Sequence, residues 1–259
     1  MRVSIICASF NSVETIRQTI ESVLSQDYND LELVIADGGS SDGTLKVIEE
    51  YSKDIIFFSE KDNGIYDALN KAFLASSGDI IGTIGSDDFY PSNDVISSVV
   101  DHFESSGSDT VYGDKQYVNF NNTSEIVRYW QGGSYKRENF LFGWMPPHLS
   151  FYAKRKLFNE YGLYNSDFSC SGDYELMLRM LYKSKVTSSY LPKVLITMRN
   201  GGKSTASMSH RLVANKEDRK AWRLNQIKPY FFTLYFKPLR KLPQLFLIPT
   251  HADSTDYTR

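Results

Sequence analysis

Cysteine is scarce in this sequence, and long apolar runs are missing. The two cysteines, Cys7 and Cys170, lie far apart and form no C-x-x-C pair, so neither a disulfide framework nor a cysteine metal site is expected. No stretch approaches the roughly 18 to 20 apolar residues of a membrane-spanning helix. The apolar N-terminal segment 3–8 is too short for the core of a signal peptide. These absences favour a protein of the reducing cytoplasm.

The chain also lacks an excess of charge of one sign. Its 29 Lys and Arg nearly balance its 31 Asp and Glu, which leaves a net charge of −2. Proteins that bind nucleic acid usually present a strongly basic surface, so no nucleic-acid partner is expected. With 259 residues, of which 41% are hydrophobic, the chain can bury a large core, and it fits one large α/β domain with or without an appendage.

Two glycine-rich nucleotide-binding loops are missing as well. The sequence contains neither G-x-G-x-x-G nor G-x-x-x-x-G-K-[ST]. The first absence excludes a Rossmann dinucleotide fingerprint, and the second argues against an NTPase. A nucleotide site in this chain would therefore be built from other residues.

The first half of the chain alternates short apolar runs, bounded by Asp, Gly or Ser, with segments of helical periodicity. We expect strands at 3–8, 31–36, 54–59, 79–84 and 110–112, and helices at 13–25, 44–51, 65–76 and 94–105. This alternation predicts an α/β fold, with a mostly parallel, Rossmann-like sheet and helices on both faces. Beyond residue 112 the pattern loosens, and a helix at 173–182 is the clearest element there.

Two adjacent carboxylates, Asp87 and Asp88, follow the strand expected at 79–84. Open α/β sheets bind ligands beyond the carboxyl ends of their strands. Neighbouring carboxylates repel each other unless a cation or polar ligand compensates. A divalent metal holding a diphosphate is the sharpest interpretation, and the alternative is that both residues belong to a turn or cap a helix.

Asp37 ends the second expected strand and is followed by a glycine- and serine-rich turn at 38–43. A carboxylate at this place can accept a hydrogen bond from a nucleobase N–H or a ribose hydroxyl, and glycines let the backbone approach closely. We interpret Asp37 as the edge of a nucleotide pocket. Asp42, by contrast, fits the start of the next helix.

The chain carries four ordered motifs, V-S-I-I-C-A-S-F-N at 3–11, D-G-G-S-S-D-G-T at 37–44, E-K-D-N-G-I-Y-D-A-L-N at 60–70 and S-D-D at 86–88. Together these motifs resemble those of the family 2 inverting glycosyltransferases of bacterial polysaccharide synthesis. The resemblance extends from residue 1 to about residue 205. It implies a GT-A fold, in which a nucleotide-binding α/β half joins a more variable, irregular acceptor half.

On this resemblance the chain divides into three parts. Residues 1–112 form the nucleotide-sugar half, residues 113–212 form the acceptor and catalytic-base half of the same domain, and residues 213–259 form a basic, aromatic C-terminal extension. Within the first part, the resemblance implies that Ser9 and Asp37 lie against the base and ribose. Asp62 and Asn63 would border the nucleotide.

The resemblance also implies a metal. Asp87 would face the ribose or diphosphate, and Asp88 would ligate Mn²⁺ or Mg²⁺, which would stabilise charge on the leaving diphosphate. Ser86 stands where a strict D-x-D signature has its first Asp, so Asp88 is the one well-assigned protein ligand. A Mg²⁺ ion commonly takes one or two carboxylates together with substrate phosphates, which suits this pair.

The S-G-D-Y-E-L segment at 171–176 resembles the family's general-base motif, and Asp173 matches it best. The family often reads Glu-Asp, whereas Gly172 precedes Asp173 here, so Glu175 is the lesser candidate. The alternative is that Asp173 only caps a helix. His148 follows a proline where the family often has a histidine near the acceptor, and the alternative is a structural role.

Residues 199–207 are rich in glycine and serine and carry the cations Arg199 and Lys203. Such a segment suits a mobile loop that closes over phosphates, so Arg199 or Lys203 is expected to touch the diphosphate. An ordinary surface loop is an equally good interpretation.

The segment 219–252 carries seven Lys and Arg, no acidic residue and many aromatics. That composition suits a membrane interface with anionic headgroups, and the alternative is a C-terminal helix packed on the domain. Prolines at 229, 238, 243 and 249 argue against one long helix.

The resemblance thus implies a metal-dependent, inverting hexosyltransferase. Its donor would be a nucleotide-sugar, most often a UDP-sugar. Its acceptor would be a saccharide hydroxyl, such as that of a polyprenyl-diphosphate-linked oligosaccharide in O-antigen, capsule or exopolysaccharide synthesis. The enzyme would be cytoplasmic, with peripheral contact to the inner membrane.

Two alternatives remain at this point. A non-catalytic nucleotide-sugar or polysaccharide-binding subunit of an assembly complex would need the fold but not Asp173. A sugar nucleotidyltransferase fits less well, because the glycine-rich basic loop expected after its first strand is replaced by Ser9-Phe10-Asn11-Ser12.

Overall fold

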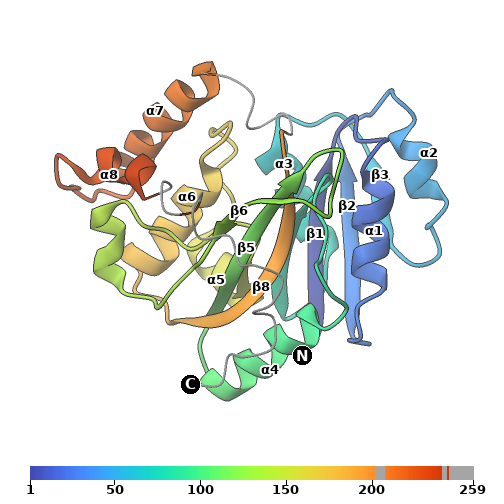
Figure 1. Cartoon of the computed structure of the whole chain (residues 1–259), viewed down its shortest axis with the longest axis horizontal. Helices are drawn as coiled ribbons and strands as arrows, with labels where there is room; N and C mark the ends of the chain where they lie inside the picture. Colours follow the sequence, from blue (N-terminus) through green and yellow to red (C-terminus); the bar gives the residue numbers. More distant parts are fainter. Residues whose placement is uncertain (202–207, 241–243, 245–259) are drawn as a thin grey trace.

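The computed structural model of the chain describes residues 1–201, 208–240 and 244 (Figure 1). Within these residues eight strands form one sheet. Seven of them follow the order β3-β2-β1-β4-β7-β5-β6, and β8 also pairs with β5, in parallel. The strands are β1 (Val3–Ser9), β2 (Leu31–Asp37), β3 (Ile56–Ser59), β4 (Ile80–Gly85), β5 (Thr110–Asn119), β6 (Ile126–Trp130), β7 (Phe151–Lys154) and β8 (Ser188–Asn200). The helices are α1 (Ile16–Leu24), α2 (Thr44–Glu49), α3 (Ile65–Ala75), α4 (Val95–Ser106), η1 (Arg137–Phe142), α5 (Arg155–Tyr161), α6 (Gly172–Met177), η2 (Leu178–Lys183), α7 (Met208–Leu224) and α8 (Thr233–Leu239).

The first half confirms the expected order of strands and helices. Each observed element lies within about three residues of its expected ends, except that β5 continues to Asn119 instead of stopping at Tyr112. Strands β3, β2, β1 and β4 are mutually parallel, as the alternation predicted. Parallel order follows because each strand returns through a helix that packs on the sheet.

Helices cover both faces of the sheet, as expected (Figure 1). A hydrophobic core lies on each face of the sheet, and successive residues of β1 point into different cores. Ile5 and Cys7 pack with α1, α2 and α4, whereas Ile6 packs with α3, α5 and α6. Ile5 and Ile6 are fully buried. Each such side chain contributes roughly 1.5 to 3 kcal/mol of transfer free energy, so this strand anchors both layers.

The register of the parallel strands brings their carboxyl ends to one edge. Ser9 at the end of β1 lies opposite Asp37 at the end of β2, and Ala8 lies opposite Gly85 at the end of β4. The segment that follows β4 carries Asp87 and Asp88. Side chains that are far apart in the sequence therefore meet at this edge.

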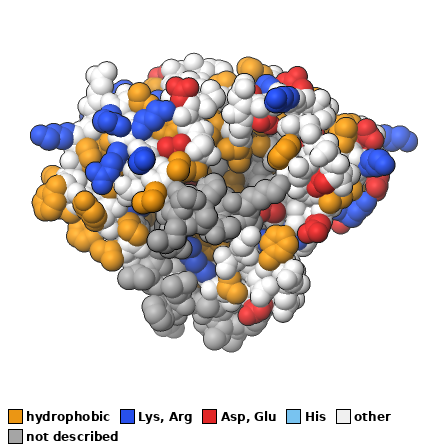
Figure 2. Space-filling view, turned by 90° about the horizontal axis from the view of Figure 1, so that it is seen from above, with side chains coloured by type: hydrophobic (Ala, Val, Ile, Leu, Met, Phe, Trp, Pro, Cys, Tyr) orange, Lys and Arg blue, Asp and Glu red, His pale blue; other side chains and the backbone are white. Residues whose placement is uncertain are grey.

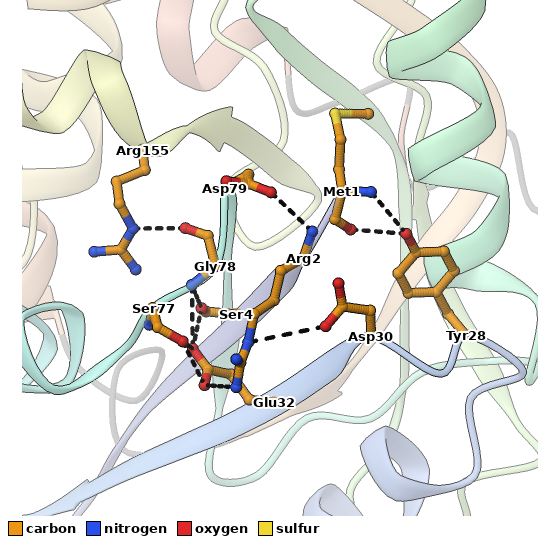
Figure 3. A network of polar contacts seen from close by, with 10 residues as sticks. All are labelled: Met1, Arg2, Ser4, Tyr28, Asp30, Glu32, Ser77, Gly78, Asp79 and Arg155. Atoms are coloured by element: carbon orange, nitrogen blue, oxygen red, sulfur yellow. Dashed lines mark hydrogen bonds and ion pairs between the residues drawn. The ribbon is translucent and has the colours of Figure 1, made fainter.

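The amino ends of the same strands are held by a polar network (Figure 3). The Glu32 carboxylate accepts hydrogen bonds from Ser4 Oγ at 2.5 Å, from the backbone N–H of Ser77 at 2.5 Å and from Arg2 at 2.7 Å. Burial by itself raises the pKa of Glu32, but these donors outweigh it and hold that pKa below its usual value. The network joins β1 and β2 to the turn before β4.

The second half holds more regular structure than its sequence pattern suggests. Strand β7 enters the sheet antiparallel between β4 and β5, and the long β5 pairs with β6 and with the parallel β8. The expected helix at 173–182 is present as α6, which continues as the π-helix η2. Strand β7 has only four residues and β8 contains Pro192, so neither shows a clean alternation in the sequence.

Where the structure describes the C-terminal extension, it forms two separate helices, α7 and α8, on the side of α6 and η1. Trp222 of α7 is buried and donates its indole N–H to Tyr174 of α6 at 2.9 Å. Gly143, at φ +74°, allows α8 to pack on η1, because a Cβ there would lie 2.5 Å from the backbone nitrogen of Lys237. None of the described helices combines the length and apolar character needed to cross a bilayer.

Candidate active site

Asp37 is fixed by its own turn at the carboxyl edge of the sheet. It is 1% exposed, and its carboxylate accepts hydrogen bonds from the backbone N–H groups of Gly39 and Ser40 at 3.1 and 2.9 Å. The hydroxyls of Ser40 and Ser59 donate to it at 2.5 and 2.6 Å. These donors keep the carboxylate in one orientation before any ligand binds.

The loop after β3 closes against this turn. Asp62 accepts a hydrogen bond from the N–H of Gly64 at 2.8 Å, and a Cβ at Gly38 would collide with the Asp62 carboxylate. The neighbouring Asn63 donates its backbone N–H to Asp67 at 3.0 Å. The structure therefore brings the sequence-predicted residues Asp37 and Asp62 together.

Ser9 lies beside Asp37 and is 2% exposed. Its hydroxyl has no hydrogen-bond partner among the residues that the structure describes. Leaving a buried polar group unsatisfied costs about 1 to 3 kcal/mol, so such groups call for an explanation. A ligand at this edge of the sheet would supply the missing partner.

The carboxylates of Asp87 and Asp88 fold back over the end of β4. A Cβ at Gly85 would lie 2.5 Å from Asp88 Oδ2 and 3.1 Å from Asp87 Oδ1, so a glycine is needed there. Asp88 is 2% exposed, and its Oδ1 is buried without a hydrogen-bond partner among the described residues. Burial, and then the charge of Asp87, raise the pKa of Asp88 well above its usual value.

This arrangement fits a divalent cation. A cation at Asp88 Oδ1 would satisfy the orphaned oxygen and offset the repulsion from Asp87. In the described part of the chain, no group of three or more His, Cys, Asp or Glu could hold a metal by itself. The remaining ligands would therefore be substrate phosphates and water, as Mg²⁺ commonly accepts.

Arg199, near the end of β8, contacts the loop that carries the two carboxylates. It is 7% exposed and donates to the backbone carbonyl of Asp87 and to the side-chain oxygen of Gln18. Its guanidinium carbon lies 5.2 Å from the centre of the Phe89 ring. Arg199 thus holds the Asp87–Asp88 loop in place, while Lys203 lies outside the described residues.

Asp173 begins α6, and its side chain is 25% exposed. Its Oδ1 lies 3.4 Å from the hydroxyl of Tyr66, which donates to it, and its Oδ2 lies 3.7 Å from Nδ1 of His148. Burial raises the pKa of Asp173, and the charges of Lys237 and Lys115 partly offset this effect. A carboxylate whose pKa is raised toward neutrality is better suited to accept a proton.

Lys115 of β5 is fully buried, and its charge acts on both Asp173 and Asp88. Its Nζ lies 3.1 Å from Nδ1 of His148 and 4.7 Å from the centre of the Trp130 ring. The charge of Lys115 lowers the pKa of both Asp88 and Asp173. Sequence analysis missed this residue because the expected strand ends at Tyr112, which leaves Lys115 outside it.

Tyr66 is the second residue that sequence analysis missed, although it lies within a quoted motif. A Cβ at Gly172 would lie 2.7 to 2.9 Å from carbons of the Tyr66 ring. The glycine before Asp173 therefore gives Tyr66 the space to reach that carboxylate. A larger side chain at position 172 would displace the Tyr66 ring.

Glu175 lies away from this group. It is 4% exposed and forms an ion pair with Arg179 at 2.9 Å, while Asn225 of α7 donates to it at 3.0 Å. Its carboxylate joins α6 to α7. Of the two acidic residues in this motif, the structure brings only Asp173 beside His148.

Curated proteins similar to this chain include glycosyltransferases. Among curated proteins, the chain is 27% identical over 206 residues to a PGL/p-HBAD biosynthesis glycosyltransferase of Mycobacterium tuberculosis, with 77% of each chain covered. It is 29% identical over 182 residues to chondroitin synthase of Escherichia coli, which covers 69% of this chain and 26% of that protein.

Solved structures share the fold at low sequence identity. S. aureus TarS 1–349 in complex with UDP-GlcNAc matches with a TM-score of 0.70 at 18% identity, covering 87% of this chain and 65% of that one. The mannosyltransferase PcManGT from Pyrobaculum calidifontis, in complex with GDP-Man and Mn²⁺, matches with a TM-score of 0.67 at 18% identity, covering 91% and 68%. The GT-A fold implied by the four motifs is confirmed.

The family profile described as Glycosyl transferase family 2 matches residues 4–172. This range includes the Ser9–Asp37 edge and the Asp87–Asp88 loop, and it ends immediately before Asp173. The chain therefore belongs to glycosyl transferase family 2.

Proposed function

We propose that this protein transfers a sugar from a UDP-sugar to a hydroxyl of a saccharide acceptor, with inversion at the anomeric carbon. The observation that carries the proposal is the buried, unsatisfied Oδ1 of Asp88 at the carboxyl edge of the sheet, where such folds bind nucleotides. The UDP-GlcNAc bound to S. aureus TarS and the GDP-Man bound to PcManGT support a nucleotide-sugar donor.

The donor nucleotide binds along the ends of β1, β2 and β3. The fixed Asp37 carboxylate accepts a hydrogen bond from the base or ribose, and Ser9 Oγ gains its missing partner. Asp62 and Asn63 border the nucleotide from the loop after β3. Because Asp37 is already oriented, little conformational entropy is lost when the donor binds.

Asp88, with Asp87 beside it, would hold Mn²⁺ or Mg²⁺ against the diphosphate. When bound, the cation stabilises the charge that develops on the leaving nucleoside diphosphate. Arg199 keeps the Asp87–Asp88 loop in position through its bond to the Asp87 carbonyl. The Mn²⁺ in the PcManGT structure supports this assignment.

Asp173 acts as the general base. It takes the proton of the acceptor hydroxyl while that oxygen attacks the anomeric carbon, and the bond from that carbon to the diphosphate breaks. Tyr66 and His148, which lie 3.4 and 3.7 Å from its two oxygens, keep the carboxylate facing the acceptor. The nucleoside diphosphate departs on the opposite face of the sugar.

We propose further that the acceptor is a polyprenyl-diphosphate-linked oligosaccharide of surface-polysaccharide synthesis, such as O-antigen, capsule or exopolysaccharide. The protein would then work at the cytoplasmic face of the inner membrane. The mycobacterial glycosyltransferase named for PGL/p-HBAD biosynthesis and the chondroitin synthase support a role in a glycan-building pathway.

The test is release of nucleoside diphosphate from a panel of UDP-, GDP- and dTDP-sugars, with Mn²⁺, Mg²⁺ or EDTA. We expect one UDP-sugar to be hydrolysed slowly in the presence of metal, and Asp88→Ala to lose that activity. Donor binding without turnover, even with a lipid-linked acceptor present, would instead indicate a non-catalytic binding subunit.

A further inference from the structure

The outer side of α7 carries a basic groove that the proposed reaction does not use. The groove has a volume of about 360 Å³ and lies between α7 and the turn that leads to α8. It is lined by Lys216, Arg219, Trp222, Arg223, Ile227 and Pro229. Three cations and three apolar side chains thus share one concave surface.

An exposed aromatic cluster continues from this groove over α8. Phe231 is 89% exposed, and Tyr230, Tyr235 and Leu239 are each at least half exposed. The rings of Tyr230 and Phe231 each pack on the ring of Phe232, with centroids 5.2 Å apart. Contiguous exposed apolar surface of this kind marks an interaction site.

The cations of the groove are not neutralised by the acidic residues of α7. Glu217 accepts hydrogen bonds from the backbone N–H groups of residues 169–171, and Asp218 pairs with Lys237 at 2.8 Å. Within the described residues, none of Lys216, Arg219 and Arg223 forms an ion pair. From residue 219 to residue 240 the sequence contains no acidic residue, and Lys228 and Arg240 add exposed positive charge.

The charge distribution differs between the two ends of the molecule. Figure 2 shows Lys and Arg side chains gathered with hydrophobic ones at the left end, whereas acidic and basic side chains are mixed at the right end. In Figure 1 the left end is formed by α7 and α8, and the right end by α2. A positive, aromatic surface complements an anionic lipid interface.

We propose that the α7–α8 face, defined as the groove and the cluster Tyr230, Phe231, Tyr235 and Leu239, docks on an anionic lipid bilayer. A phospholipid phosphate would occupy the groove between Arg219 and Arg223, and the aromatic side chains would enter the headgroup region. This inference rests on the proposed function, since it names the surface through which a lipid-linked acceptor is met.

The inner side of α8 lies close to the proposed base, Asp173. Lys237 lies 3.6 Å from the centre of the Tyr174 ring, and Tyr174 follows Asp173 directly. The same short helix thus presents Tyr235 and Leu239 outward and Lys237 toward the start of α6. A saccharide held by its lipid at the outer face would need to extend only past α8 to reach the base.

The experiment is sedimentation of the full chain with vesicles of phosphatidylcholine, with and without a third of phosphatidylglycerol. We expect binding to the anionic vesicles only. The double variant Arg219→Gln, Arg223→Gln should weaken that binding roughly 10- to 30-fold, as each cation near an anionic surface contributes about a factor of five. Phe231→Ser, at an 89% exposed position, should weaken it without disturbing the fold.

The matched control is Lys46→Gln, Lys53→Gln, which removes the same charge from exposed positions in and after α2 and should leave vesicle binding unchanged. Metal-dependent donor hydrolysis by the Arg219→Gln, Arg223→Gln variant should equal that of the original protein. Equal loss of binding in both double variants would overturn the inference, as would a protein that hydrolyses donor but binds neither vesicle. A concentration-dependent dimer that Phe231→Ser dissociates would assign the face to a second copy instead.

Discussion

Two buried carboxylates at opposite ends of the same sheet behave in opposite ways. Glu32, at the amino ends of the strands, accepts bonds from Ser4, Ser77 and Arg2, and its pKa is held low. Asp88, at the carboxyl ends, has an unsatisfied oxygen, and burial and Asp87 hold its pKa high. Saturated partners indicate a carboxylate that stabilises the fold, whereas a missing partner indicates one that meets a ligand.

The largest effect is expected at Asp173, the proposed general base. Asp173→Asn keeps the shape and the contact with Tyr66 but removes the proton acceptor. Turnover should fall by roughly 10²- to 10⁴-fold, the usual contribution of a positioned base. Calorimetric titration with the donor should give an unchanged affinity, and unchanged turnover would rule out Asp173 as the base.

A smaller catalytic effect is expected for Lys115→Met. The charge of Lys115 lowers the pKa of Asp173, so its removal should raise that pKa. Because the base must be ionised, the acidic limb of the pH–rate profile should move to higher pH, and turnover at a pH on that limb should fall. A lower rate with an unmoved pH profile would mean that Lys115 acts only through packing.

The contrast between Glu32 and Asp88 is tested by removing the negative charge of each residue in turn. Glu32→Gln should destabilise the protein by roughly 1 to 3 kcal/mol, because Arg2 loses its partner and several donors lose an acceptor. Asp88→Asn should instead raise the melting temperature of the metal-free protein, since it removes a repelled, desolvated charge. Chemical denaturation and thermal melts in EDTA measure both, and a destabilised Asp88→Asn would contradict the assignment.

The smallest effect is the pH dependence of the Glu32 contribution. Its folded pKa lies below the usual value of 4.5, so the stability it provides is present above that pH and is lost as pH falls through the folded pKa. The difference in melting temperature between the original protein and Glu32→Gln should therefore be constant near neutrality and shrink below about pH 4.5. If the difference in melting temperature persisted at low pH, the charge of the Glu32 carboxylate would not be what stabilises the amino ends of the strands.

Much of the arrangement at the carboxyl edge of the sheet could be predicted from local sequence. Asp37, Asp62 and the Asp87–Asp88 pair follow strands in the order of the chain, and parallel strands bring their carboxyl ends to one edge. The neighbours of Asp173 were less accessible, although Asp173 itself was predicted from its motif, because Tyr66 and Lys115 come from α3 and β5. Their approach depends on packing between elements, which no local pattern encodes.

Glu175 likewise shows that a local motif does not reveal which way a side chain points in the folded protein. It lies two residues after Asp173 in the same motif, yet it binds Arg179 and Asn225 instead of facing the site. Successive helical positions point in different directions, so the packing of α6 against α7 determines which acidic residue is available.

The sequence by itself determined the order of strands and helices in the first half, the membership of family 2 and which carboxylates lie at the carboxyl ends of the parallel strands. These features depend on short-range periodicity and on motifs whose residues are close together in the chain. The tertiary structure alone decided that Lys115 is buried beside His148, that Gly172 makes room for Tyr66 and that α8 packs on η1 at Gly143. Each of these depends on steric fit between segments distant in sequence, and such fit is defined only once the chain has folded.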